Sequence, residues 1–198
     1  MVTSGRSRSR WDSTVSDAGD FVDAALQLES TGQRAIDHET RIGTDLLFYG
    51  ASVGAVRGTI RDVGQRYPGL GHDEITALAS ELWRTPVFER RLAAIVLLQT
   101  KVRLLDNSDL TRLEGFLRDA RTSALADPLV ADVILPLVEA LDAPSRSRAN
   151  VAVGRWAAES NPWLRSAAQQ LGVRLGRPGQ QRPIQPSQSA PGGRLRDT

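Results

Sequence analysis

Apolar positions recur along most of the chain at intervals of three and four residues, the spacing of one face of an α-helix. Residues 72–84, for example, place Ile75, Leu78 and Leu82 on one face. No segment alternates convincingly with the two-residue period of a half-buried strand. We therefore predict an all-α protein, with helices at residues 16–30, 52–67, 72–84, 86–105, 107–121, 128–141, 147–160 and 162–175.

Three of the predicted helices begin at a proline that follows a polar residue. The junctions are Thr85-Pro86, Asp127-Pro128 and Asn161-Pro162. A polar side chain can cap a helix, and proline suits the first helical position because it lacks an amide that would have no partner there. Pro136 should kink or break the helix predicted at 128–141.

The junctions are 42 and 34 residues apart, close to the period of HEAT-like helix pairs. We predict a short HEAT-like α-solenoid, with a closed α-bundle as the competing architecture. The expected pairs are 52–67 with 72–85, 86–105 with 107–122, and 128–142 with 147–160. The helix at 162–175 then lacks a partner, so its outer face is either exposed or covers another chain. This last helix is therefore a candidate surface for self-association or for a protein partner.

The 198 residues, 40% of them apolar, suffice for one domain with a sizeable core. Residues 1–12 are rich in Ser and Arg, and residues 176–198 are rich in Pro, Gly, Gln and Ser. Both compositions are typical of disordered segments. We predict three parts, a disordered basic N-terminus at 1–12, a helical repeat domain at 13–175 and a disordered tail at 176–198.

The net charge of +2 is unevenly distributed. The first ten residues carry three arginines and no acid, and residues 176–198 carry four arginines and one aspartate. The body is therefore slightly acidic, and it lacks on average the strongly basic footprint of a phosphate-binding protein.

Several kinds of chemistry are excluded or disfavoured by residue usage. The absence of cysteine excludes disulfides, thiolate metal sites and a cysteine nucleophile, and the two histidines, His38 and His72, form no metal motif. We expect no metal and no cofactor. The longest apolar run, residues 92–98, is far shorter than a membrane span, and no secretory signal is apparent. We expect a cytoplasmic protein, associated with the nucleoid if it binds DNA.

Two consecutive segments have motifs in a distinctive order. The first contains Phe48-Tyr49-Gly50 followed by a helix with Val56 and Arg57, and the second contains Glu81-Leu82-Trp83 followed by Pro86 and Glu89. Together with the later stretches DLTRLEGFLRDARTSALADPL and GRWAAESNPWLRSAA, this order resembles the AlkD-like bacterial DNA alkylation repair proteins. The resemblance covers about residues 40–170.

The resemblance implies a curved stack of HEAT-like repeats that holds duplex DNA on its concave face. It also implies excision of cationic N3- and N7-alkylated purines, for which a fixed carboxylate near the sugar oxocarbenium ion is the main requirement. Aromatic faces would add cation–π stabilisation, and an arginine would position a phosphate.

Residue by residue, the resemblance places the catalytic aspartate at Asp127. Ser123 occupies a position where the family has Trp, and Ser166 that of the phosphate-binding Arg. The second Trp of the family site would belong to a repeat beyond this chain, so the resemblance implies a truncated or degenerate member with reduced activity. The residues expected to contact DNA are Arg57, Arg91, Arg121, Trp163 and Arg165.

Alternatives remain at this point. Asp127 fits an N-cap before Pro128 as well as a catalytic carboxylate, and a shifted alignment would give the role to Asp132. Trp163 fits an interhelical core position. The rival function is a non-catalytic helical scaffold that binds DNA or a protein partner.

Overall fold

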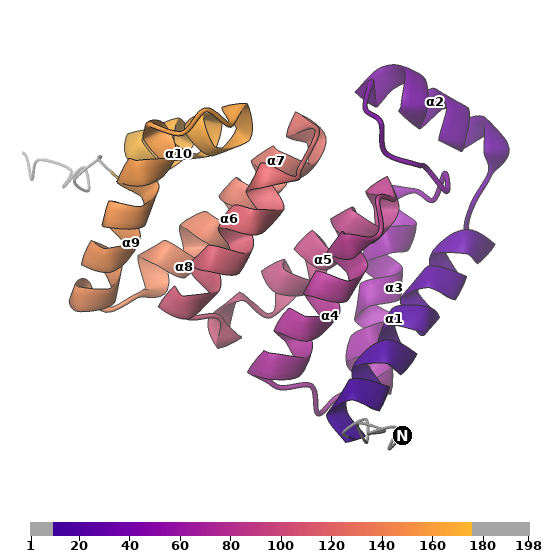
Figure 1. The fold of residues 1–198 in the computed structure, drawn as a ribbon. Helices are drawn as coiled ribbons and strands as arrows, with labels where there is room; N and C mark the ends of the chain where they lie inside the picture. The colour runs from indigo at the N-terminus through magenta and orange to yellow at the C-terminus, as the bar shows by residue number, and fades with distance from the viewer. Residues whose placement is uncertain (1–9, 176–198) are drawn as a thin grey trace, which may run out of the picture.

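A computed structural model describes residues 10–175, and these residues form a row of α-helices (Figure 1). The elements are α1 (Arg10–Leu28), α2 (Gly32–Ile42), α3 (Val53–Arg66), α4 (His72–Arg84), α5 (Phe88–Thr100), α6 (Leu110–Arg118), α7 (Ser123–Leu129), α8 (Leu135–Ala140), α9 (Ala143–Ala157) and α10 (Pro162–Leu175). Short 3-10 turns at Val102–Leu104 and Asn107–Asp109 join α5 to α6. The prediction of an all-α fold is confirmed.

The predicted ends of the chain lie largely outside the described residues. Helix α1 begins at Arg10, inside the segment 1–12 predicted to be disordered. Residues 1–9 and the tail 176–198 are not described, and the division into three parts stays a prediction. No helix among residues 10–175 has the length and apolar character needed to cross a membrane.

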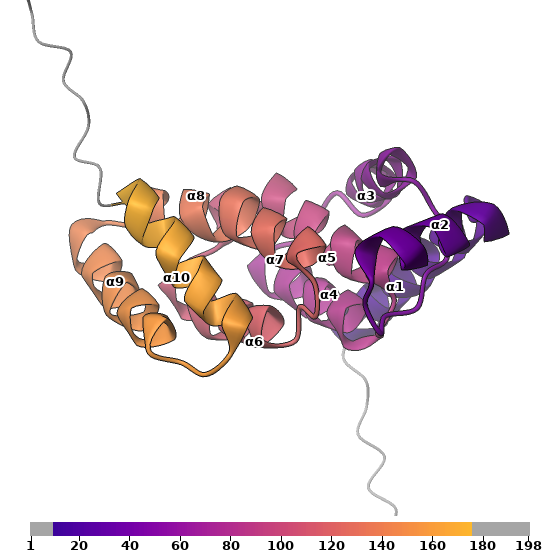
Figure 2. The ribbon, with the colours of Figure 1, turned by 90° about the horizontal axis from the view of Figure 1, so that it is seen from above.

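Helices close in the chain pack in pairs, and two of the three predicted pairs differ from the observed ones, while 128–142 with 147–160 corresponds to the contact of α8 with α9. Helix α1 packs on α3, α4 on α5, α6 on α7, and α9 on α10. Further contacts join α1 to α4 and α3 to α5, so the pairs stack side by side. Viewed from above, α3 and α8 lie along one side of the stack and α6 and α9 along the other (Figure 2).

The prediction that helix 162–175 lacks a partner is wrong. Leu164, Ala167, Ala168 and Leu171 of α10 are buried, and the helix packs on α9, α6 and α7. The observation that suggested self-association through this helix is therefore removed.

Helix α2 was not predicted, because it has no buried residue and so no apolar stripe facing a core. It lies above one end of the stack (Figure 1). Arg34 ties it down, since its guanidinium donates to the carbonyl oxygens of Gly50 at 2.7 Å and Glu29 at 2.6 Å.

The Phe48-Tyr49-Gly50 motif is explained by a buried carboxylate on α5. Glu89, only 1% exposed, accepts hydrogen bonds from the amides of Tyr49 at 3.0 Å and Gly50 at 2.8 Å. Gly50 has a φ of +83°, and a Cβ there would collide with the carbonyl oxygen of Thr31. The motif therefore fixes a loop against α5, a structural role.

Candidate functional site

The segment with Asp127 begins its helix earlier than predicted. Helix α7 starts at Ser123, and the Thr122 hydroxyl accepts the amide of Ala124 at 3.3 Å as the N-cap. Asp127 therefore lies inside the helix, and the alternative that it caps a helix from Pro128 is wrong. A π-helical stretch, Val130–Ile134, continues into α8. It lies between two prolines that each remove one amide from the helical ladder, Pro128 and Pro136.

The Asp127 carboxylate is exposed on α7 and faces α10. The side-chain amide of Gln170 donates to its Oδ1 at 3.0 Å and lies 3.4 Å from the Ser166 hydroxyl. The other oxygen, Oδ2, has no hydrogen-bond or ion-pair partner within residues 13–175. A negative charge thus stands at the surface, oriented by one amide and neutralised by no cation in this part of the chain.

Trp163 belongs to the same stripe of α10. Residues 163, 166 and 170 follow at intervals of three and four, which places them on one helical face. Trp163 is half-buried against the core, and its amide is held by Asn161 Oδ1 at 3.0 Å. We call the surface formed by Ser123, Asp127, Trp163, Ser166 and Gln170 the Asp127 face.

A cavity of about 420 Å³ opens beside the N-terminus of α7. Ser123 lines it from α7, His38 and Arg41 line it from α2, and Phe88 and Leu92 come from α5. Ser123 precedes Asp127 by one helical turn, so the cavity and the carboxylate are neighbours. The larger side chain that the family resemblance implies at position 123 would have space here.

Arg91 is in the core, contrary to the expectation that it contacts DNA. It is 1% exposed, and its guanidinium donates to the carbonyl oxygen of Trp83 at 3.1 Å and to the Asp119 carboxylate at 2.6 Å. It also lies over the Trp83 ring, 5.2 Å from the centroid. A guanidinium so occupied joins α4, α5 and the end of α6, and it is not accessible to a phosphate.

Arg121 lies directly before α7 and is engaged by two carboxylates. Its side chain donates to Asp119 Oδ1 at 3.0 Å and to Asp45 Oδ2 at 2.9 Å, and the Asp119 hydrogen bond is the main reason that its pKa is raised. Arg121 also has a φ of +61°, unusual for a residue with a side chain. Asp119 connects it to Arg91. This network of ion pairs fixes the turn that leads into α7.

The remaining predicted DNA contacts lie apart from each other. Arg165 is exposed at the α9–α10 turn, where it donates to the carbonyl oxygens of Glu159 at 3.0 Å and Ser160 at 2.7 Å. Arg57 is exposed on α3 and lines a separate groove between α3 and α5. The structure thus brings Asp127 and Trp163 to adjacent helices, and places Arg57 and Arg165 elsewhere on the surface.

Gln170, His38 and Arg41 were missed by sequence reasoning. Gln170 follows Trp163 by seven residues, a spacing that indicates a shared helical face, whereas nothing in the sequence links α2 to α7. Within the described residues, no group of three or more His, Asp or Glu side chains is arranged to hold a metal ion.

Comparison with known proteins adds one finding to this geometry. A sequence model of the family described as DNA alkylation repair enzyme matches residues 22–183, most of the chain. No curated protein matches the sequence. The matched range includes every residue of the Asp127 face and the Glu89 anchor.

Proposed function

The chain belongs to the DNA alkylation repair enzyme family, and from that premise we propose that it cleaves the N-glycosidic bond of N3- or N7-alkylated purines in duplex DNA. In this proposal Asp127 stabilises the positive charge on the sugar. The family membership supports the role in DNA alkylation repair and DNA as a partner. The reaction and the residues are our proposal.

The observation that supports this proposal is the state of the Asp127 carboxylate. It is exposed, it is oriented by Gln170, and no cation among residues 13–175 pairs with it. A carboxylate that stabilises developing positive charge must be fixed in position but not already neutralised. Asp127 meets both conditions, whereas the carboxylates of Glu89, Asp119 and Asp109 are engaged by partners inside the protein.

The chemistry needs little else from the protein. An N7-alkylpurine already carries a positive charge, so when the bond from C1′ to the base nitrogen breaks, the electron pair leaves with a neutral base. No general acid is required. The sugar is left as an oxocarbenium ion, which Asp127 would stabilise across a short distance. A water molecule then adds to C1′ and loses a proton, completing the hydrolysis.

A second candidate function, DNA binding without catalysis, is favoured by the residue at position 123. Ser123 offers no aromatic face to a sugar cation, and each absent cation–π contact would cost about 0.5–2 kcal/mol of transition-state stabilisation. A protein that recognises the duplex but releases no base would fit this substitution.

Release of 7-methylguanine from methylated duplex DNA separates the two functions. We expect release by the wild type and a loss of about 100-fold or more in Asp127→Asn, because a preorganised electrostatic group is removed. Asp132→Asn is the matched control, since it changes a half-buried acid in the same helical run and tests the shifted alignment. Asp127→Asn should leave the unfolding free energy within about 0.5 kcal/mol of the wild type.

The result that would overturn the catalytic proposal is the absence of base release by the wild type. Duplex binding that weakens linearly on a logarithmic salt scale would then favour the second candidate. Affinity indifferent to salt would argue against both.

A further inference from the structure

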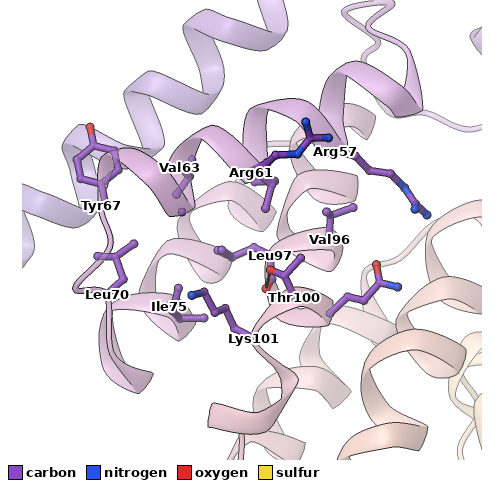
Figure 3. Close-up of a pocket in the computed structure, with 13 residues that line it drawn as sticks. Arg57, Arg61, Val63, Tyr67, Leu70, Ile75, Val96, Leu97, Thr100 and Lys101 are labelled. Atoms are coloured by element: carbon purple, nitrogen blue, oxygen red, sulfur yellow. Dashed lines mark hydrogen bonds between the residues drawn. The ribbon is translucent and has the colours of Figure 1, made fainter.

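A second concave site lies toward the C-terminal ends of α3 and α5, away from the residues of the Asp127 face. It is a groove of about 590 Å³ between α3, the C-terminal end of α5 and the loop that leads into α4 (Figure 3). This volume is typical of small-molecule sites, which measure about 300–1,000 Å³. Neither the proposed reaction nor the Asp127 face uses it.

The floor of the groove is aliphatic. Side chains from α3, α4 and α5 form it, namely Ile60, Val63, Ile75, Val96 and Leu97. These residues are also part of the main core, so the floor is held rigidly from behind. The floor side chains are only 1–6% exposed, so an apolar group seated on the floor gains free energy from the small part of their surface that still faces the groove.

The rim is cationic. Figure 3 shows Arg57 and Arg61 reaching from α3, with Lys101 opposite them at the end of α5. None of these three side chains has an ion pair or hydrogen bond within residues 13–175, and no carboxylate lines the groove. Arg90, Arg91, Arg118 and Arg121 differ in this respect, since each is paired with an acid.

We propose that this groove binds an amphipathic organic anion, with an aliphatic chain on the floor and a carboxylate or phosphate head among Arg57, Arg61 and Lys101. Phosphate contact alone would require the cations but not the aliphatic floor. The two ends of the chain do not suit the cationic groove, because both are positively charged. Residues 1–9 carry two arginines, and residues 176–198 carry four with a single acid. An anionic head with an apolar body matches both halves of the site.

The first test is calorimetric titration of the full chain with monomeric dodecanoate, decanoate and octanoate. We expect affinity to rise about fourfold for each methylene that is fully covered by the floor. Dodecyl phosphate should bind as well as dodecanoate. Dodecyltrimethylammonium, with a similar tail and the opposite charge, should bind at least tenfold more weakly, and equal binding of this cation would overturn the proposal.

A pocket-filling variant locates the site. Gly64 lines the groove on α3, and a Cβ there meets no atom within 4 Å, so Gly64→Leu should fold and should occupy the floor. Gly58→Leu is the matched control on the same helix, since Gly58 is equally open but does not line the groove. We expect dodecanoate binding to be lost in Gly64→Leu and kept in Gly58→Leu. Wild-type binding by Gly64→Leu would overturn the assignment.

Charge removal and a membrane control complete the test. Arg57→Gln combined with Arg61→Gln should weaken dodecanoate binding about 2- to 25-fold, the range for two exposed charge pairs. Binding to phosphatidylglycerol vesicles without binding to monomeric dodecanoate would point to a membrane surface and would overturn the proposal. Because Gly64→Leu keeps every charge and leaves Asp127 untouched, it should retain base release, so this inference and the proposed function can fail separately.

Discussion

Two acidic residues, Glu89 on α5 and Asp127 on α7, lie in contrasting surroundings. Glu89 is buried, and both of its oxygens accept backbone amides from the loop at 49–50. Asp127 is exposed, and within residues 13–175 one side-chain amide, that of Gln170, orients it. The number of partners, more than the residue type, therefore separates a carboxylate that holds the fold from one that is available for chemistry.

The arginines differ in the same way. Arg91 is buried and its donors are satisfied by Trp83 and Asp119, whereas Arg57 is exposed without an acidic partner among the described residues. Both were predicted to contact DNA from the sequence alone. Only the exposed arginine keeps a free charge to offer a ligand.

The largest expected effect comes from removing the satisfied carboxylate. Glu89→Ala leaves the amides of Tyr49 and Gly50 buried without an acceptor, and it should reduce the unfolding free energy by about 3–5 kcal/mol. Urea unfolding followed by circular dichroism measures this. Glu39→Ala, at an exposed position on α2, is the control and should change stability by less than about 0.5 kcal/mol. A similarly small change in the unfolding free energy of Glu89→Ala would contradict the proposed role of Glu89 in anchoring the loop.

Substitution within the loop that Glu89 holds should reduce the unfolding free energy nearly as much as substitution of Glu89 itself. Gly50→Ala introduces a Cβ at φ +83° that would lie 2.7 Å from the Ala35 amide nitrogen, and we expect a loss of about 2–4 kcal/mol. Gly58→Ala is the matched control, because its Cβ meets nothing within 4 Å and it lies within α3. That variant should gain up to about 1 kcal/mol. Equal effects of the two variants would show that the loop is not constrained.

An aromatic side chain introduced at position 123 should increase base release at the Asp127 face. Ser123→Trp places an aromatic ring one turn before Asp127, beside the cavity lined by His38 and Arg41. If the proposed reaction occurs, the rate of 7-methylguanine release should rise about 2- to 30-fold, which corresponds to 0.5–2 kcal/mol of cation stabilisation. Ser123→Leu is the control for apolar bulk alone. An equal increase in both variants would exclude a cation–π origin.

The smallest expected effect on stability comes from His72, a partly exposed side chain with acidic partners. His72 Nε2 lies 2.9 Å from Asp109 and Nδ1 lies 2.8 Å from Asp73. The hydrogen bond to Asp109, followed by that to Asp73, raises the pKa of His72 above its usual value of about 6.5, against a smaller opposing effect of burial.

Because this pKa is higher in the folded state, the stabilisation is complete below about pH 6.5 and is lost as the pH rises through the folded-state value. The unfolding free energy of the wild type should therefore fall across this window relative to that of His72→Gln. Urea unfolding of both proteins between pH 5.5 and 8.5 checks the difference. A difference that stays constant with pH would contradict the proposed pairing.

The three proline junctions, each predicted to start a helix, differ in whether a helix begins there in the structure. Asn161 caps α10 as predicted, with Oδ1 accepting the amides of Trp163 and Leu164. Thr85-Pro86 does not start a helix, because Leu47 pairs with the backbone of Pro86 and Phe88 and keeps that segment extended. At Asp127-Pro128 the helix begins earlier, since Thr122 provides the cap. The same dipeptide pattern therefore has different outcomes that depend on distant partners.

Two of the three predicted helix pairs, 52–67 with 72–85 and 86–105 with 107–122, were wrong for a related reason, whereas 128–142 with 147–160 corresponds to a contact of α8 with α9. We took the proline junctions as boundaries between pairs, but the short turns at 85–87 and 158–161 lie inside the pairs α4–α5 and α9–α10. Short connections favour antiparallel packing of the helices that they join. For α4–α5 and α9–α10, the short connection was the better signal, and it was present in the sequence.

The sequence by itself determined the all-α fold, most of the helices and the family, because helical periodicity and ordered motifs are local and linear properties. It also singled out Asp127 as the carboxylate of interest. Only the tertiary structure decided which charges remain available. Within residues 13–175, Arg91 and Glu89 are satisfied by residues from other elements, whereas Asp127 has one amide partner and no cation, and the side chains of Arg57, Arg61 and Lys101 have no partner. Hydrogen-bond satisfaction depends on neighbours that are distant in the chain, and residue spacing cannot encode it.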